Sequence, residues 1–263
     1  MELLLSAQSM TKRFGGLVAV DDVSIDIHKG EVVGLVGDNG AGKSTLIKMI
    51  SGVYQPDGGE LFLDGKKVAL SGPREARDLG IETIYQDLAL AENLDVGSNI
   101  FLGRELKNPY LRGLICTLNR RKMREESAGI LSKLDIQVPS LTQQIRNLSG
   151  GQRQAVAIAR SIYWNARLMI MDEPTAALGV IEQRKVLMLV RTLAGQGVPV
   201  IIISHNMQDV FAVSDRIVVM RRGMKVGELV AKNTTPDEVV SLMVGAEAVH
   251  EMGVIPKALE GEE

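Results

Sequence analysis

The spacing of hydrophobic and polar residues changes several times along the chain. Over residues 17–27, apolar side chains such as Val23, Ile25 and Ile27 alternate with polar ones, which is typical of a strand with one covered face. Short apolar runs between turn-forming residues predict further strands. These predicted strands span residues 3–9, 32–36, 60–63, 81–85, 168–171, 198–203 and 224–230.

Between the strands, apolar residues three and four positions apart predict helices. The clearest helical patterns span residues 120–134, 153–163 and 181–193. A last helix is expected after Thr235, which is a suitable N-cap and is followed by Pro236 and by Glu238 at the capping-box position. The alternation of strands and helices predicts an α/β fold.

The patterns also divide the chain. From about residue 88 to residue 160 the strand pattern stops and helical patterns take over, with a short loop near 108–113, so we expect a helical subdomain inserted into an α/β core. Turn signals around residues 60–63 predict a small antiparallel sheet beside that core. We expect one domain over residues 1–245 and an acidic, mobile tail over residues 246–263.

The composition is that of a globular protein. The 263 residues are 45% hydrophobic and 24% charged, and the formal net charge of −2 argues against a nucleic-acid partner. Cys116 is the only cysteine, which excludes an internal disulfide and a zinc site made of four cysteines. The apolar runs are far shorter than the ~18 residues that span a bilayer. We expect a protein that is neither transmembrane nor secreted.

A glycine-rich stretch after the strand at 32–36 carries the strongest chemical signal. Residues 37–44, GDNGAGKS, fit the pattern G-x-x-x-x-G-K-[ST] between a predicted strand and a predicted helix. Glycines allow successive backbone N–H groups to surround an anion at a helix N-terminus. Lys43 would then reach the β- and γ-phosphates of a nucleotide, and the Ser44 hydroxyl would bind Mg²⁺. The alternative, an ordinary glycine-rich turn, is disfavoured by the strand and helix on either side.

Two acidic residues follow the apolar strand at 168–171. If this strand is parallel to the strand at 32–36, Asp172 would lie beside Ser44 and bind Mg²⁺ through its water shell. Glu173, one residue further on, could orient and deprotonate an attacking water. The alternative is a surface strand end with two solvated acids, and the glycine-rich stretch upstream makes it the weaker interpretation.

Residues 148–152, LSGGQ, predict a second anion site. Ser149, Gly150 and Gly151 directly precede the predicted helix at 153–163, so free N–H groups and a hydroxyl are available there for a phosphate. One nucleotide cannot easily be surrounded by both of these helix N-termini of the same chain. The economical inference is a head-to-tail pair of chains, each covering the γ-phosphate of the nucleotide bound by the other.

Taken together, these motifs resemble those of the ATP-binding-cassette (ABC) ATPases over nearly the whole chain. The matching segments are GDNGAGKS, Gln86 after the strand at 81–85, LSGGQ, the run LMIMDE that ends at Glu173, and His205 in IIISHN. LSGGQ at this distance before LMIMDE is highly specific for the family. The sequence around Gln86 and the stretch DRIVVMRRGMKVGEL resemble the carbohydrate-importer branch, which serves ribose, galactose, xylose or fructose permeases.

The resemblance implies a fold and a set of catalytic residues. The fold is a P-loop NTPase core of the RecA-like kind, with an antiparallel β subdomain and an inserted α-helical subdomain. Glu173 would be the general base, His205 would contact the γ-phosphate, and Lys43 would hold the phosphates. A structural hydrogen-bonding role is the alternative for His205.

The resemblance also implies ATP and Mg²⁺ as cofactors and assigns residues to each. Mg²⁺ would be surrounded by Ser44, Gln86 and Asp172. The residues around ATP would be Phe14, Gly37, Asp38, Asn39, Gly40, Ala41, Gly42, Lys43, Ser44, Thr45 and Gln86 from one copy, and Ser149, Gly150, Gly151 and Gln152 from the second copy. For Phe14, which is expected on a loop, stacking on adenine and an ordinary core or edge position are both open.

Partners and a location follow from the same resemblance. Two copies would close on two Mg·ATP, and the helical subdomain and the loop after Gln86 would transmit closure to a polytopic membrane permease. That permease would import a monosaccharide delivered by a sugar-binding protein, and the chain would be peripheral at the cytoplasmic face of the inner membrane. The alternatives are a soluble ABC ATPase without a permease, such as an iron–sulfur assembly type, and a nucleotide-dependent scaffold.

One segment departs from the family. The loop after Glu173 commonly ends in Ser-Ala-Leu-Asp, but here it reads Ala176, Ala177, Leu178 and Gly179, so the usual acidic group is absent. The departure bears on communication between the two nucleotide sites and not on nucleotide binding. Because several sugar-importer cassettes carry two such units in one chain and this chain carries one, we expect a homodimer.

Overall fold

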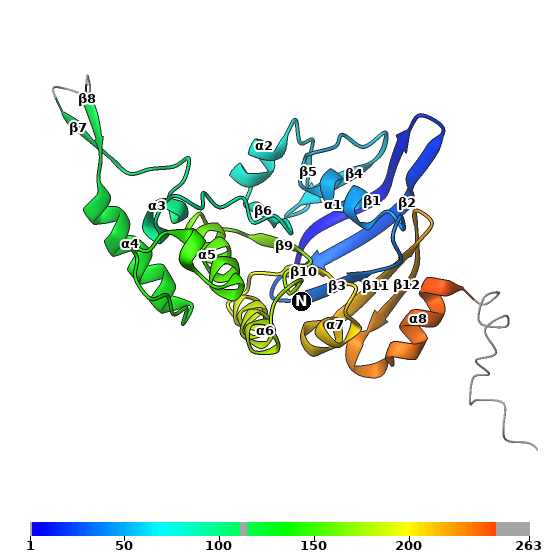
Figure 1. The fold of residues 1–263 in the computed structure, drawn as a ribbon. Coiled ribbons are helices and arrows are strands. Elements are labelled where there is room, and N and C mark those ends of the chain that lie inside the picture. The colour runs from blue at the N-terminus through cyan, green and yellow to red at the C-terminus, as the bar shows by residue number, and fades with distance from the viewer. Residues whose placement is uncertain (1, 111–114, 246–263) are drawn as a thin grey trace, which may run out of the picture.

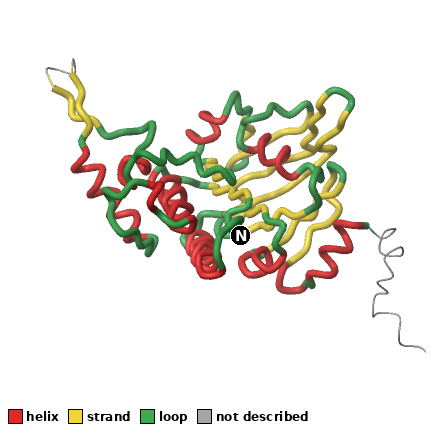
Figure 2. The backbone as a smooth tube through the Cα atoms, viewed as in Figure 1, coloured by secondary structure: helices red, strands yellow, loops and turns green. Residues whose placement is uncertain are grey.

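The computed structural model describes residues 2–110 and 115–245, which form a six-stranded sheet, a four-stranded sheet and a largely helical segment that carries a two-stranded hairpin. A six-stranded sheet lies at the centre, a four-stranded sheet lies on one side of it, and the helical segment extends on the other side (Figure 1). Figure 2 shows the same division by colour, with most helices grouped away from the four-stranded sheet. The fold is therefore α/β, as the sequence predicts.

The central sheet is mostly parallel and has the strand order β12-β11-β3-β10-β9-β6. Its strands are β3 (Val32–Val36), β6 (Ile81–Ile84), β9 (Leu168–Asp172), β10 (Val200–Ile203), β11 (Arg216–Arg221) and β12 (Met224–Val230). Only β12 pairs in the antiparallel sense. The carboxyl ends of β3, β10 and β9 therefore meet at one edge of the sheet.

The second sheet is antiparallel and has the order β2-β1-β4-β5. Its strands are β1 (Leu3–Phe14), β2 (Leu17–His28), β4 (Gly58–Leu63) and β5 (Lys66–Val68). β1 continues beyond the predicted end at Ser9. Ser9 adopts a φ of 50° at an irregularity where the register with β2 shifts, and pairing with β2 resumes at Met10. Phe14 consequently ends a strand, and its predicted place on a loop is wrong.

Helix α1 (Lys43–Ile50) packs between the two sheets. Its Leu46 and Ile50 belong to a buried cluster that contains residues of β1 and β2 on one side and Leu168 and Ile170 of β9 on the other. Alternate residues of β9 face the opposite way. The central sheet is therefore buried on both faces, which explains why its strands are continuous apolar runs.

Two long helices, α5 (Gly150–Tyr163) and α6 (Val180–Gly195), cover the opposite face of the central sheet. They share a buried cluster with Met169 and Met171 of β9. The shorter helices α7 (Met207–Val213) and α8 (Pro236–Val244) pack with β11 and bury Ile217 and Val219. α8 begins with the predicted capping box of Thr235 and Glu238.

The segment between β6 and β9 is mainly helical. After α2 (Pro73–Asp78) and β6, it contains α3 (Val96–Ile100), α4 (Arg120–Lys133), a short 3-10 turn at Ile145–Asn147 and α5. It also contains an antiparallel hairpin of β7 (Lys107–Tyr110) and β8 (Ile115–Leu118), where the sequence predicts only a short loop. Figure 1 shows this hairpin projecting at the far end of the segment.

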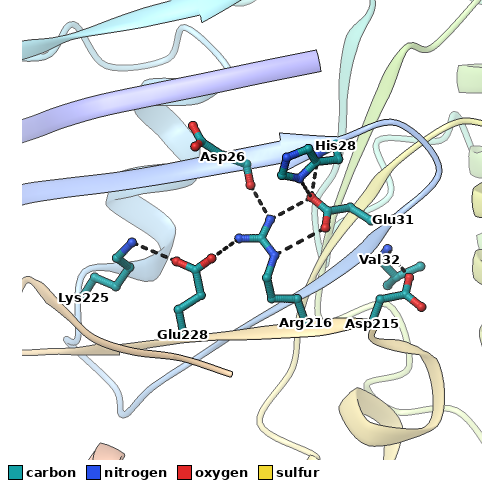
Figure 3. A network of polar contacts seen from close by, with 8 residues as sticks. All are labelled: Asp26, His28, Glu31, Val32, Asp215, Arg216, Lys225 and Glu228. Atoms are coloured by element: carbon teal, nitrogen blue, oxygen red, sulfur yellow. Dashed lines mark hydrogen bonds and ion pairs between the residues drawn. The ribbon is translucent and has the colours of Figure 1, made fainter. Parts of the chain in front are cut away.

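A polar network ties the central sheet to β2 at the edge away from the glycine-rich loop (Figure 3). Glu31, whose side chain is 5% exposed, accepts hydrogen bonds from the Arg216 guanidinium at 2.7 and 3.4 Å and from the His28 N–H at 2.6 Å. Arg216 also pairs with Glu228 of β12. Burial lowers the pKa of Arg216, but the hydrogen bonds and charges of Glu31 and Glu228 outweigh it, so the pKa is raised.

In the part of the chain that the structure describes, no helix is both long and apolar enough to span a membrane. The predicted tail over residues 246–263 lies outside the described residues.

Candidate functional site

The phosphate loop (residues 37–45) connects the central strand β3 to α1. Gly37, Gly40 and Gly42 have φ values of 149°, 80° and 99°, which are unfavourable for residues with a Cβ. A Cβ at Gly37 would lie 2.2 Å from the carbonyl oxygen of Met220, and one at Gly42 would lie 2.5 Å from that of Ala19. Glycine is therefore required at these two positions both by conformation and by space.

The loop leaves backbone donors unused. The N–H groups of Gly40 and Gly42 have no hydrogen-bond partner among the described residues, while the N–H of Ala41 donates to the carbonyl of Asp38 at 3.0 Å and closes the turn. The first N–H groups of α1 have no acceptor within the helix. Ser44, in the first turn of α1, is exposed. Free donors at a helix N-terminus are suited to bind phosphate oxygens.

Lys43 is held inside the phosphate loop. Its Nζ donates to the carbonyl oxygens of Gly37 at 2.6 Å and Asp38 at 2.9 Å. Burial lowers the pKa of Lys43, and the negative charges of Glu173, Asp38 and Asp172 oppose that shift. The ammonium group therefore lies within electrostatic reach of both acids at the end of β9.

The two acids stand level with the phosphate loop across β10. Ile203 of β10 pairs with Asp172 on one side and with Leu35 of β3 on the other, so the ends of the three strands are aligned. Burial raises the pKa of the Asp172 carboxyl above its ordinary value, and the neighbouring Glu173 raises it further. Asp172 has no hydrogen bond or ion pair with the described residues, and a nearby cation would stabilise its charged form.

Glu173 and His205 are brought together by adjacent strands. Glu173 adopts a φ of 52° directly after β9, and its N–H donates to the carbonyl of Ile203 at 2.9 Å. The backbone N–H of His205 donates to Glu173 Oε1 at 3.1 Å, and His205 Nδ1 lies 2.9 Å from Glu173 Oε2. The carboxylate is 20% exposed whereas the imidazole is 80% exposed. The backbone N–H of His205 thus orients the acid through Oε1, while Oε2 is buried beside the imidazole without a hydrogen bond and the imidazole itself remains exposed.

Gln86 is exposed and lies two residues after β6, the strand next to β9. The loop that follows it is attached to α5, because the Arg160 guanidinium donates to the carbonyls of Leu88 at 3.1 Å and Ala89 at 2.9 Å. Sequence reasoning missed Arg160. The available signal was its seven-residue distance from Arg153, which places two arginines on one face of the predicted helix.

Phe14 lies at the end of β1 in the antiparallel sheet. The residue is 43% exposed, and its ring makes an edge contact with Tyr54, with 5.3 Å between ring centroids. Lys12 Nζ lies 5.7 Å from the centre of the same ring. Phe14 is therefore not a core residue, and its ring has exposed surface on which a planar group could stack.

The signature segment (residues 148–152) forms the start of α5. Ser149 is the N-cap and makes a reciprocal capping box with Gln152, in which Ser149 Oγ accepts from the Gln152 N–H and Gln152 Oε1 accepts from the Ser149 N–H. Ser149 and Gly150 are exposed. Because α5 and α1 cover opposite faces of the central sheet, the signature segment and the phosphate loop belong to different sides of one molecule.

The residues predicted to surround a metal have a suitable chemistry. A carboxylate on Asp172, a hydroxyl on Ser44 and an amide oxygen on Gln86 are hard oxygen donors, and Mg²⁺ commonly binds proteins through one or two carboxylates together with substrate phosphates. The unpaired Asp172 agrees with such a role. Among the described residues no group of three or more His, Cys, Asp or Glu could hold a metal alone.

This arrangement defines a class of protein. A phosphate loop after a central parallel strand, with an acidic pair and a histidine on the next two strands, is the site of a P-loop nucleotide hydrolase. The family model described as "ABC transporter" matches residues 20–176, which is more than half of the chain. The chain belongs to the ABC transporter family and is an ATP-hydrolysing cassette of that family.

Individual relatives agree over almost the whole length. The chain is 50% identical over 243 residues to a xylose/arabinose import ATP-binding protein of Sulfolobus acidocaldarius, covering 92% of this chain and 94% of the relative. It is 44% identical to a fructose import ATP-binding protein of Rhizobium meliloti, covering 93% and 95%. A solved ATP-binding cassette of an ABC transporter superposes with a TM-score of 0.80 at 28% identity, covering 93% of this chain and all of that one.

Proposed function

We propose that the chain is the ATP-hydrolysing subunit of an importer for a monosaccharide, and that Glu173 and His205 carry out the hydrolysis. The contact that carries this proposal is the pairing of His205 Nδ1 with Glu173 Oε2 at 2.9 Å, level with the phosphate loop. The names of relatives at 44–50% identity, which import xylose/arabinose and fructose, support a pentose or hexose as the transported molecule.

In this proposal Glu173 accepts a proton from the water that attacks the γ-phosphate. Its carboxylate is 20% exposed, and the hydrogen bond from the His205 N–H to Oε1 orients it, so it is held in place and still reaches solvent. The exposed imidazole contacts the γ-phosphate. Lys43 leaves its carbonyl partners in the loop to bind the β- and γ-phosphate oxygens.

The remaining predicted residues bind the nucleotide and its metal. The phosphate loop surrounds the phosphates, Phe14 stacks on adenine, and Ser44, Gln86 and Asp172 hold Mg²⁺. When bound, Mg²⁺ neutralises charge on the phosphate oxygens. The carboxyl of Asp172 supports this assignment, because it has no hydrogen bond or ion pair among the described residues. The charges of Lys43 and Lys48 offset its raised pKa only in part, and a bound cation would stabilise the charged form further.

We propose that two copies of the chain form the active unit. The signature segment and the phosphate loop belong to opposite sides of one molecule, which supports a head-to-tail dimer in which Ser149, Gly150, Gly151 and Gln152 cover the nucleotide of the second copy. The exposed N-terminus of α5 can then add its free N–H groups to the γ-phosphate.

A groove lined by Tyr85 and Ala89, on either side of Gln86 in the sequence, is the proposed contact with the permease. It has a volume of about 390 Å³ and lies between α2, β6 and α5, with Arg77, Arg104 and Arg160 facing a single acid, Glu82. Burial raises the pKa of Glu82, although the three arginines oppose the shift. Since Arg160 also holds the loop after Gln86, a partner in this groove is connected to the nucleotide site and to α5.

The location follows from these partners. The chain would lie at the cytoplasmic face of the inner membrane, bound to the permease, and a separate sugar-binding protein would deliver the sugar to the permease. Co-purification of the full chain from detergent-solubilised membranes of its own cells tests this part. A polytopic membrane protein should be recovered with it, and Arg104→Glu in the groove should reduce the recovery. Absence of any membrane protein would contradict the proposal.

The catalytic part is tested with Glu173→Gln. This variant keeps the shape of the side chain and loses the base, so ATP should still bind and hold two copies together while turnover falls about 10²- to 10⁴-fold. Glu60→Gln, on the exposed face of β4, is the matched control and should leave turnover unchanged. Turnover of Glu173→Gln within threefold of the parent protein would reject Glu173 as the base.

A further inference from the structure

Glu182 lies between two glycines that belong to separate functional segments. A Cβ built on Gly179, the last residue of the loop 176–179, would lie 2.8 Å from Glu182 Oε2. A Cβ on Gly151 of the signature segment would lie 2.8 Å from Cγ and 2.9 Å from Cβ of the same glutamate. Side chains at either glycine would displace Glu182, so the absence of both side chains creates the space that it fills.

Gly150 and Leu178, next to Gly151 and Gly179 in the sequence, are packed in the same way. A Cβ on Gly150 would lie 2.6 Å from Leu178 Cδ2. The start of α5 and the loop before α6 therefore interlock through two glycines of the signature segment. Movement of either segment is transmitted to the other by direct packing.

The carboxylate of Glu182 is half-buried and has no hydrogen bond or ion pair with the described residues. It stands in the first turn of α6, whose N-cap Gly179 offers no side chain. Its Oε2 lies 2.8 Å from the point where a side chain on residue 179 would begin. The acid that the family commonly has at this position is absent, and the carboxylate of Glu182, three residues further on in the first turn of α6, lies next to that position.

We infer that Glu182 is a positioning residue that supplies the acidic group missing from Gly179 and pairs with a hydrogen-bond donor of the second copy when two chains close on ATP. The inference rests on the proposed dimer. A carboxylate beside Gly151 would repel a phosphate bound at the signature segment unless a donor compensated it. Closure therefore requires the pairing, and the pairing makes each nucleotide site dependent on the other.

Glu182→Gln separates charge from shape. ATP-dependent dimer formation is measured by size-exclusion chromatography with Glu173→Gln present in all proteins, so that hydrolysis does not interfere. Loss of the carboxylate should weaken the dimer about tenfold, as expected for a lost hydrogen bond to a charged group, and without Glu173→Gln it should lower the Hill coefficient for ATP. Asp237→Asn removes an equivalent charge from the first turn of α8 and should change neither measurement.

A second pair of variants tests the position of the carboxylate. Gly179→Asp alone should weaken the dimer, because the new side chain meets Glu182, although the backbone φ of −68° accepts aspartate and an N-cap favours it. Combining Gly179→Asp with Glu182→Ala should restore the dimer above the level of either single variant. A lowered melting temperature with an unchanged dimer would assign Glu182 a purely structural role and overturn the inference.

Three further outcomes of these experiments would contradict the role of Glu182 or the proposed dimer. Tighter dimers with Glu182→Gln would show that the carboxylate opposes closure, which overturns the inference. A combined variant no better than Glu182→Ala would overturn it as well. If the Glu173→Gln protein itself fails to dimerise with ATP, the proposed dimer is wrong. This result is distinguishable from a dimer of normal affinity that Glu182→Gln does not weaken, which overturns only the inference about Glu182.

Discussion

Replacing Arg216 with methionine tests how the central sheet is held at the edge away from the nucleotide site. The change removes a buried cation and keeps most of the volume of the side chain. Glu31 would retain its contacts with His28, but its Oε2 would lose the Arg216 Nε at 3.4 Å and its Oε1 would lose Nη2 at 2.7 Å. A carboxylate that is 5% exposed would then be buried without a permanently charged partner, because His28 Nδ1, at 3.2 Å, is charged only when it is protonated.

The expected cost is about 3–5 kcal/mol, because removing one partner of a buried ion pair leaves the other charge unpaired. For a chain of this size about 2–4 °C is lost per kcal/mol, so the melting temperature should fall by on the order of 10 °C. Urea unfolding followed by circular dichroism gives the free energy of unfolding directly. Lys225→Met, which removes the more exposed cation bound to Glu228, is the control and should cost less than about 1 kcal/mol.

Adding Glu31→Gln to Arg216→Met removes the unpaired charge and should recover most of the lost stability. A cost below about 1 kcal/mol for Arg216→Met, or a double variant no more stable than Arg216→Met alone, would refute the reasoning. Because the network lies away from the phosphate loop, the folded fraction should bind ATP with unchanged affinity.

Three further predictions concern the site and the groove. Gly37→Ala should prevent tight ATP binding and destabilise the fold, because the new Cβ would meet the Met220 carbonyl oxygen. Gly65→Ala is the control: its φ of 72° is strained but the space is open, so it should cost only about 1–3 kcal/mol of stability. Isothermal titration measures the ATP affinity of both variants, and thermal melts measure their stability. Glu82→Gln should raise the melting temperature near neutral pH, since a folded-state pKa above the ordinary 4.5 makes the charged wild-type group destabilising there. The difference should shrink as pH falls through the raised pKa and disappear below 4.5. Arg160→Met should speed hydrogen exchange in residues 87–91 and cost about 1.5–3 kcal/mol.

Regular periodicity explains which elements could be predicted from the sequence. Strands buried on both faces, such as β9 and β10, read as continuous apolar runs, and capped helices such as α8 carry their own start signals. The hairpin of β7 and β8 escaped prediction because it pairs only with itself and has Pro109 within a strand, so no covered face imposes an alternating pattern. The predicted range of β1 ends too early, at Ser9, because the part of the strand that follows the irregularity at Ser9 is polar.

Motifs located the phosphate loop and the acidic pair, but contacts between distant segments could not be derived from the sequence. That Glu173 meets His205 depends on β10 lying directly beside β9, and strand order follows from packing of the whole domain. Arg160 and Glu182 belong to no motif. Their positions became evident only once the chain was folded, because their neighbours lie in segments remote in sequence.

The way the helical segment is joined to the central sheet limits how it can move. It leaves after Ile84, which pairs with Met171, and the chain returns before Leu168, which pairs with Ile81, so the two junctions lie at opposite ends of one pair of strands. A body hinged at two points can swing only about the line through them. That line runs along β6 and β9, so any rocking of the segment would have to shift α5 against Met169 and Met171 of β9 and against the loop 176–179, which packs on its start.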